Sequence, residues 1–185
     1  LKPTPCLNMA IKKANGKYIT FAFLDDRKSK DCLETLYNAI TNSEVSLVYG
    51  NVAQSKKANE TFEENDLKIL SEHSKPEFSR ENMVKCLPGP MPLWRRAIHE
   101  QCGLFDEDNN NYADDWEMWL RAVSYGFVFK KVNKIVGLYL EGGRSQQKNN
   151  MDQRKEEAIL FFKYSRLFGY NYNKYVPYFR QFLQG

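Results

Sequence analysis

The sequence predicts an α/β fold, and two observations lead to that class. Helix-like and strand-like patterns alternate along the first part of the chain, an order typical of α/β proteins. The stretch from Gly16 to Arg27 reads as a strand that ends in two adjacent carboxylates, Asp25 and Asp26. The carboxyl end of a strand is where open α/β sheets place their ligands. The 185 residues, 42% of them hydrophobic, suffice for one globular domain with a sizeable core.

The first part of the chain is predicted to contain two helices and two strands. Leu7 to Ala14 has the pattern of a short helix that ends at Asn15-Gly16. Tyr18 to Leu24 follows as a strand buried on both faces. Cys32 to Thr41 is a second helix, and Val45 to Val52 is a buried parallel strand. The apolar face of the second helix is formed by Leu33, Leu36, Tyr37 and Ile40.

The middle of the chain is predicted to hold a long loop and two helices. Gln54 to Lys75 is polar with little periodicity, as in a surface loop. Leu87 to Trp94 contains three prolines and is expected to be extended. Trp94 to Gln101 reads as a short helix, and Asp114 to Tyr125 as the strongest one. Its apolar face contains Trp116, Trp119, Leu120 and Val123.

The last part of the chain is predicted to contain two strands and a helical end. Phe127 to Val132 and Ile135 to Leu140 read as strands separated by Asn133-Lys134, and a long helix spans roughly Asp152 to Phe168. The aromatic residues of the tail are expected to pack on the domain, with contact to a membrane surface as the alternative. They are Phe161, Phe162, Phe168, Tyr175, Phe179 and Phe182, interleaved with Lys163, Arg166 and Arg180.

Composition and charge narrow the class of partner. The formal net charge is +4, and 27 basic residues are mixed with 23 acidic ones along the chain. Basic residues so dispersed predict no nucleic-acid partner. No run approaches the roughly 20 apolar residues of a membrane helix, and we expect no secretory leader. The four cysteines show no CxxC spacing, which predicts free thiols in a reducing compartment. We therefore expect a cytoplasmic location, with the inner face of a membrane as an alternative. The cysteines are Cys6, Cys32, Cys86 and Cys102.

Two pairs of aspartates are the main candidates for chemistry. Asp25 and Asp26 can be turn formers, or they can hold Mg²⁺ or Mn²⁺ that binds the phosphates of a nucleotide sugar. Asp114 and Asp115 begin a helix, where Asp is favoured as a cap. They can alternatively supply a general base, because the partial charge of a helix N-terminus favours an ionised carboxylate.

Two further segments are candidates for binding. Trp94-Arg95-Arg96 can be core packing followed by a solvated basic turn, or the wall of an acceptor pocket, since sugars stack on aromatic faces. Glu141 to Ser145 is a glycine-rich turn that carries Arg144. It can be only a loop, or it can bring the guanidinium onto phosphates, which arginine binds bidentately.

In this order, the motifs resemble inverting family 2 glycosyltransferases of the GT-A fold, from Asn8 to about Tyr139. The resemblance implies a Rossmann-related mixed sheet flanked by helices. The matching segments are Asn8-x-Ala10-Ile11, Ala14-x-Gly16-x-Tyr18-Ile19, Asp25-Asp26, Leu47-Val48-Tyr49-Gly50, Pro92-x-Trp94-Arg95-Arg96, Cys102-Gly103-x-Phe105-Asp106-Glu107 and Asp114-Asp115-Trp116-Glu117-Met118-Trp119-Leu120-Arg121-Ala122.

The resemblance also implies roles for individual residues. Asp25 matches the aspartate that binds Mg²⁺ or Mn²⁺ at the strand end, and Asp26 supports it. Asp115 matches the acidic residue that deprotonates the acceptor hydroxyl, with Asp114 as its near alternative. The acceptor-side segment is matched by Trp94, Arg95, Arg96 and Asp106.

The chain departs from the family pattern in two places. The family shows Asp-x-Asp-Asp at the strand end, and Phe23 stands where the first aspartate belongs. The N-terminal strands that hold the nucleotide's base and ribose have no match, which predicts a fragment of a longer enzyme or a partial domain that does not bind the donor alone. We therefore expect residues 1–150 to form a partial GT-A catalytic domain, and residues 151–185 a helical extension that packs on it.

The predicted function is inverting transfer of a sugar in polysaccharide or glycan synthesis. The expected donor is a nucleotide diphosphate sugar, a UDP-sugar above others, and the acceptor is a saccharide or another hydroxyl. The alternative is a non-catalytic, transferase-like domain that binds a glycan or a protein, which Phe23 and the missing nucleotide-binding half favour.

Overall fold

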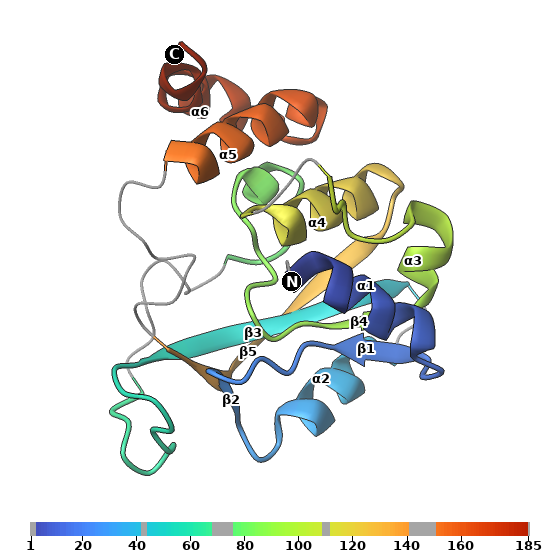
Figure 1. Cartoon of the computed structure of the whole chain (residues 1–185), viewed down its shortest axis with the longest axis vertical. Coiled ribbons are helices and arrows are strands. Elements are labelled where there is room, and N and C mark those ends of the chain that lie inside the picture. Colours follow the sequence, from blue (N-terminus) through green and yellow to red (C-terminus); the bar gives the residue numbers. More distant parts are fainter. Residues whose placement is uncertain (1–2, 42–43, 68–75, 109–111, 141–150, 185) are drawn as a thin grey trace.

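A computed structural model of the chain describes residues 3–41, 44–67, 76–108, 112–140 and 151–184. Its centre is a five-stranded mixed sheet with the spatial order β1-β4-β3-β5-β2. Helices cover both faces of this sheet (Figure 1). The strands are β1 (Tyr18–Thr20), β2 (Arg27–Lys28), β3 (Val45–Ser55), β4 (Leu93–Arg95) and β5 (Val128–Leu140).

Strand directions bring three carboxyl ends to one edge of the sheet. β3 and β5 pair in parallel. β4 is antiparallel to both β1 and β3, so β1 runs in the same direction as β3. β2 pairs with β5 in the opposite direction. The carboxyl ends of β1, β3 and β5 therefore lie at the edge where α/β proteins bind ligands.

The helices divide between the two faces of the sheet. α2 (Cys32–Ile40) covers one face, and α1 (Pro3–Lys13), α3 (Ala97–Cys102) and α4 (Asp114–Ser124) cover the other (Figure 1). Two apolar clusters correspond to these layers. Leu36 and Ile40 of α2 pack with Val48 of β3, whereas Leu47 and Trp94 face the helices of the opposite layer. Alternate residues of one strand thus enter different cores.

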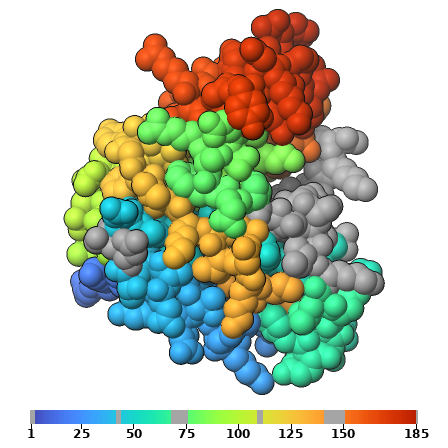
Figure 2. All heavy atoms as spheres, turned by 180° about the vertical axis from the view of Figure 1, so that it is seen from behind, coloured from blue at the N-terminus to red at the C-terminus, as the bar shows by residue number. Residues whose placement is uncertain are grey.

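The C-terminal helices extend the larger core. α5 (Met151–Lys163) and α6 (Asn171–Arg180) lie at one end of the molecule, next to the 3₁₀ turn Glu81–Val84 (Figure 2). Phe161 of α5 and Phe179 of α6 are buried in the same cluster as Trp116 of α4. The buried tail aromatics therefore serve as packing. Two further 3₁₀ turns are Ser165–Leu167 and Gln181–Leu183. No described helix has the length and apolar character needed to span a membrane.

The first strand is shorter and more exposed than the sequence predicted. β1 pairs with β4 alone within the described part of the chain, so its three residues are only half-buried. Beyond β1 the predicted strand continues as irregular chain, in which Phe21 is buried, Phe23 is 40% exposed and Leu24 is fully exposed. The prediction of a strand buried on both faces was wrong. Among the described residues β1 is an edge strand with β4 as its single neighbour, and such a strand is less covered than a central one.

Other element predictions were corrected by pairing partners. The two strands expected around Asn133-Lys134 form one strand, β5, and the predicted break is an irregularity in its register with β3. Trp94 belongs to β4, and the helix predicted from it begins at Ala97. The predicted loop from Gln54 is shortened because β3 continues to Ser55. The predicted long helix ends at Lys163.

The predicted apolar face of α2 was half right. Leu36 and Ile40 are buried against the sheet, together with Cys32, whereas Leu33 and Tyr37 are about half exposed. The four cysteines are free thiols, as predicted.

Candidate active site

The acidic pair lies in the segment that connects β1 to β2, the two outer strands of the sheet. The Lys28 ammonium of β2 donates to the main-chain carbonyl of Phe21, which closes this connection on itself. Asp26 Oδ1 accepts a hydrogen bond of 3.4 Å from the main-chain N–H of Leu140, at the end of β5. Asp25 is exposed. The connection thus holds both carboxylates at the edge where β1 and β5 end.

The two carboxylates line a pocket that is open to solvent. Burial and the neighbouring charge of Asp25 raise the pKa of Asp26 to about 6. A cation placed here relieves the repulsion between adjacent carboxylates. The pocket is lined by residues 24–27 together with Ser55, Asn59, Glu60 and Leu138.

The donor set of this pocket fits a divalent ion that also binds phosphate. No group of three or more His, Cys, Asp or Glu side chains in the described ranges surrounds one metal position. Mg²⁺ in a phosphate site, however, takes only one or two protein carboxylates and completes its shell with water and phosphate oxygens. Asp25 and Asp26 provide that number, and their hard oxygen atoms suit Mg²⁺ or Mn²⁺. The residues present therefore fit this class of metal.

The second acidic pair begins α4, and its two members have different environments. Asp114 accepts hydrogen bonds from Thr4 Oγ1 at 2.6 Å and from the N–H of Asp115 at 2.9 Å. This side chain ties α4 to α1. Asp115 Oδ1 accepts from the N–H of Trp116 at 2.6 Å, and Oδ2 lies 3.5 Å from the thiol of Cys86. Asp115 therefore faces the segment that leads into β4.

This proline-rich segment, residues 86–92, lies between the two acidic pairs. Cys86, near its start, contacts Asp115. Met91, near its end, packs on Gly137 of β5, where an added Cβ atom would lie 1.9 Å from the Met91 sulfur and 2.8 Å from the carbonyl oxygen of Arg27. The segment thus runs from the start of α4 to the acidic connection. Asp115 contacts one end of this segment, and Arg27, the residue after Asp26, lies near its other end.

Trp94 and Arg95 lie inside the fold. Trp94 is 0% exposed and donates its indole N–H to His99 Nε2 at 3.0 Å, which corresponds to the packing alternative. Arg95 donates to the carbonyl oxygens of Ile40 at 2.7 Å and Val45 at 2.8 Å. Its guanidinium therefore joins the end of α2 to the start of β3.

The other predicted binding residues are more accessible or lie elsewhere. Arg96 is exposed and forms an ion pair of 3.7 Å with Glu100. Asp106 accepts a hydrogen bond of 3.0 Å from the N–H of Asp108 in the turn before α4. Arg144 lies outside the described residues. The structure thus brings Asp25 and Asp26 together in the pocket, with Asp115 at the far end of the proline-rich segment.

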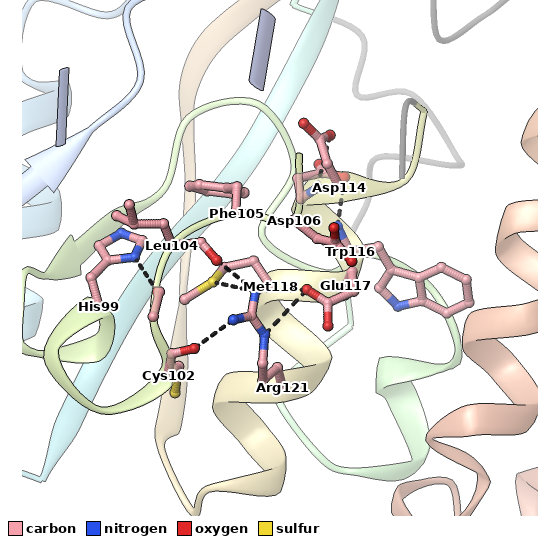
Figure 3. Close-up of polar contacts among 12 residues, drawn as sticks. His99, Cys102, Leu104, Phe105, Asp106, Asp114, Trp116, Glu117, Met118 and Arg121 are labelled. Atoms are coloured by element: carbon pink, nitrogen blue, oxygen red, sulfur yellow. Dashed lines mark hydrogen bonds and ion pairs between the residues drawn. The ribbon is translucent and has the colours of Figure 1, made fainter. Parts of the chain in front are cut away.

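Sequence reasoning missed a buried ionic network beneath α4 (Figure 3). Glu117 is 2% exposed and accepts hydrogen bonds from Arg121 at 2.8 and 3.2 Å and from the Tyr164 hydroxyl at 2.7 Å. Burial and this contact raise the pKa of Tyr164. Arg121 also donates to the carbonyl oxygens of Cys102 and Leu104. The i,i+4 spacing of Glu117 and Arg121 was a signal for the pair, but nothing local indicated Tyr164.

The comparisons with known proteins identify a family and a fold. The family model described as Glycosyl transferase family 2 matches residues 5–103. A crystal structure of S. aureus TarS matches with a TM-score of 0.63 at 15% identity, covering 97% of this chain and 52% of that one. The S. aureus TarS complex with UDP-GlcNAc also has a TM-score of 0.63, at 14% identity, covering 94% of this chain and 53% of that one.

A third solved structure is that of the mannosyltransferase PcManGT from Pyrobaculum calidifontis in complex with GDP-Man and Mn²⁺. It has a TM-score of 0.57 at 16% identity, covering 88% of this chain and 43% of that one. The present chain spans about half the length of the solved structures it matches. Among curated proteins, none matches by sequence. The mixed sheet with its helices thus matches the GT-A glycosyltransferase structures.

Proposed function

Because this chain belongs to glycosyl transferase family 2, we propose that its protein transfers a sugar, with inversion, from a nucleotide diphosphate sugar to a hydroxyl acceptor. One observation carries the proposal: an acidic pocket at the carboxyl ends of the strands and a carboxylate at the start of α4 adjoin one segment. Such an arrangement provides a donor side and an acceptor side for a direct displacement.

The donor side is the pocket around Asp25. Asp25 would hold Mg²⁺ or Mn²⁺, and Asp26 would support it directly or through hydrogen bonds. When bound, the metal would supply positive charge to the leaving diphosphate. Arg144 is proposed to bind the same phosphates from outside the described ranges. The UDP-GlcNAc and GDP-Man bound by two of the matched structures support a nucleoside diphosphate sugar as donor; among these we expect a UDP-sugar.

The acceptor side is the start of α4. Asp115 takes the proton of the acceptor hydroxyl while the oxygen of that hydroxyl forms a bond to the anomeric carbon. The bond from that carbon to the diphosphate oxygen breaks with its electron pair, and the configuration at the carbon inverts. Arg96 and Asp106 lie in the acceptor-side segment and are proposed to contact the acceptor. General base catalysis of this kind contributes about 10²–10⁴-fold to a rate.

The base assignment is tested by replacing Asp115 in the full-length protein. Asp115→Asn keeps the size and polarity of the side chain but cannot take a proton. We expect turnover to fall by at least about 10²-fold, while donor affinity measured by calorimetry stays unchanged. Asp114→Asn is the matched variant, because its amide oxygen can still accept from Thr4. Retained turnover in Asp115→Asn, or equal losses in both variants, would refute this assignment.

The metal assignment is tested by calorimetry with Mn²⁺ and UDP. Asp25→Asn is expected to weaken nucleotide affinity in the presence of Mn²⁺ by about tenfold or more, because a charge-assisted bond worth about 1.5–3 kcal/mol is lost. Glu34→Gln, an exposed carboxylate on α2, serves as the control. Equal affinities for Asp25→Asn and the parent protein would rule out this metal ligand.

A second candidate function is a non-catalytic module that binds a glycan or a protein. Phe23 favours it, because an exposed ring occupies the position of the family's first acidic residue. The same titration separates the two functions. A folded full-length protein that releases no heat with Mn²⁺ and nucleotide would support the binding module.

A further inference from the structure

A side chain of α5 forms hydrogen bonds with the residues just before α4, the helix that carries the proposed base. Glu156 Oε2 accepts hydrogen bonds from the N–H of Tyr112 at 2.8 Å and of Ala113 at 3.1 Å, the two residues just before α4. Ala113 occupies the capping position and has no side-chain oxygen, and the N–H groups of Asp115 and Trp116 in the first turn are accepted by Asp114 and Asp115. Glu156, more than forty positions further along the chain, instead fixes the two residues that lead into this turn.

A second contact from the same region holds α4 just after the base. The hydroxyl of Tyr164, one residue beyond α5, donates to the buried carboxylate of Glu117 at 2.7 Å. The Lys163 ammonium lies 3.7 Å from the same carboxylate oxygen, Oε1 of Glu117. Because Glu117 is 2% exposed and Arg121 pairs with its Oε2, the loss of the Tyr164 hydroxyl would leave the buried Oε1 without its hydrogen-bond donor at 2.7 Å.

Aromatic packing also holds α4 between the Glu156 contact and the Tyr164 contact. Trp116, which directly follows Asp115, stacks on Phe179 of α6 with ring centroids 6.3 Å apart. Its indole N–H donates to the carbonyl oxygen of Met83 at 2.9 Å. Both main-chain N–H groups before Asp114 and both side chains after Asp115 thus have defined partners, and most of these partners belong to residues 151–184.

We propose that Glu156 and Tyr164 are positioning residues for the base Asp115, and that residues 151–184 therefore form part of the acceptor side of the site. The inference rests on the proposed function for its catalytic consequence. The physical reason is that a displacement of about 1 Å can cost about 10²-fold in rate when reacting groups must be aligned. Asp115 sits between two anchored points, so α5 sets where its carboxylate lies.

The test compares substitutions of Glu156 in the full-length protein. Glu156→Ala removes the acceptor, whereas Glu156→Gln retains an amide oxygen that can accept from both N–H groups. We expect Glu156→Ala to lower kcat about tenfold or more with the donor KM unchanged, because the donor binds at the Asp25 pocket. We expect Glu156→Gln to restore most of kcat. Glu157→Ala is the matched control, since Glu157 accepts hydrogen bonds from Gln153 and Arg154 of the same helix.

Amide hydrogen exchange gives a readout that does not depend on activity. Exchange at Tyr112 and Ala113 is expected to accelerate in Glu156→Ala and to stay at the parent rate in Glu156→Gln and Glu157→Ala. Unchanged exchange in Glu156→Ala, or an equal loss of kcat in Glu157→Ala, would overturn the positioning role. An inactive parent protein would count against the proposed function alone, and exchange would still decide the positioning role.

Discussion

Arg95 and Arg96, two adjacent arginines at the end of β4, have different roles. Arg95 is the last residue of β4, and its guanidinium donates to the carbonyl oxygens of Ile40 and Val45. Arg96 begins the turn into α3 and is exposed. Successive side chains of a strand point to opposite faces. The resemblance assigned both arginines to the acceptor side, whereas the geometry engages Arg95 in joining α2 to the sheet.

Replacing each arginine by methionine separates these roles. Arg95→Met leaves two carbonyl groups without their charged donor, so we expect the free energy of unfolding to fall by about 2 kcal/mol. Arg96→Met removes an exposed ion pair and should change it by less than about 0.5 kcal/mol. Urea unfolding followed by far-UV circular dichroism measures both. Equal effects of the two substitutions would contradict the structural role of Arg95.

At the scale of elements, β5 is the strand against which the site is built. It pairs with β3 in parallel and with β2 in the antiparallel direction. Gly137 of β5 leaves room for Met91 of the proline-rich segment, because a Cβ atom there would nearly coincide with the methionine sulfur. This close approach lets the segment reach the acidic connection between β1 and β2. A glycine in a strand often marks such a contact.

Substitution of this glycine should disturb the segment more than the sheet. Gly137→Ala is expected to lower the free energy of unfolding by about 1–3 kcal/mol through overpacking. The double variant Met91→Ala/Gly137→Ala should recover part of this loss, because the sulfur no longer opposes the new methyl group. Urea unfolding of both single variants and of the double variant measures the coupling. Strictly additive effects would show that Met91 and Gly137 do not share this space.

At the scale of the whole molecule, the C-terminal helices and the sheet layers share one core. Phe161 is buried and stacks on Phe179 with ring centroids 4.4 Å apart, and Phe179 in turn contacts Trp116 of α4. The same apolar cluster continues through Trp119 to Trp94 of the sheet. Continuous packing of this kind predicts that the two parts unfold together.

Truncation of the central aromatic ring tests this continuity. Phe161→Ala is expected to lower the free energy of unfolding by about 3–5 kcal/mol. The loss should appear in a single transition, with the near-UV signal of the tryptophans and the far-UV signal changing together. Leu183→Ala, at an exposed position, should change stability by less than about 0.5 kcal/mol. Two separate transitions would mean that residues 151–184 unfold on their own.

Long periodic segments were predictable, and very short strands were not. The start of α4 at Asp114 and its buried tryptophans follow from local spacing, and the structure confirms them. β2 and β4 have two and three residues, respectively. Such strands exist because β5, β1 and β3 provide partners for their main chain, and a partner distant in sequence leaves no local signal.

The sequence by itself determined the family, the alternation of helices and strands, and the acidic residues that begin α4. These features depend on side-chain chemistry and on the spacing of residues that are close in sequence, so they can be predicted from the sequence directly. Only the tertiary structure decided that β1 is a short, half-buried strand, that Trp94 and Arg95 hold the fold together, and that Glu156 and Tyr164 reach α4. The reason is that burial and long-range hydrogen bonds depend on which distant segments meet.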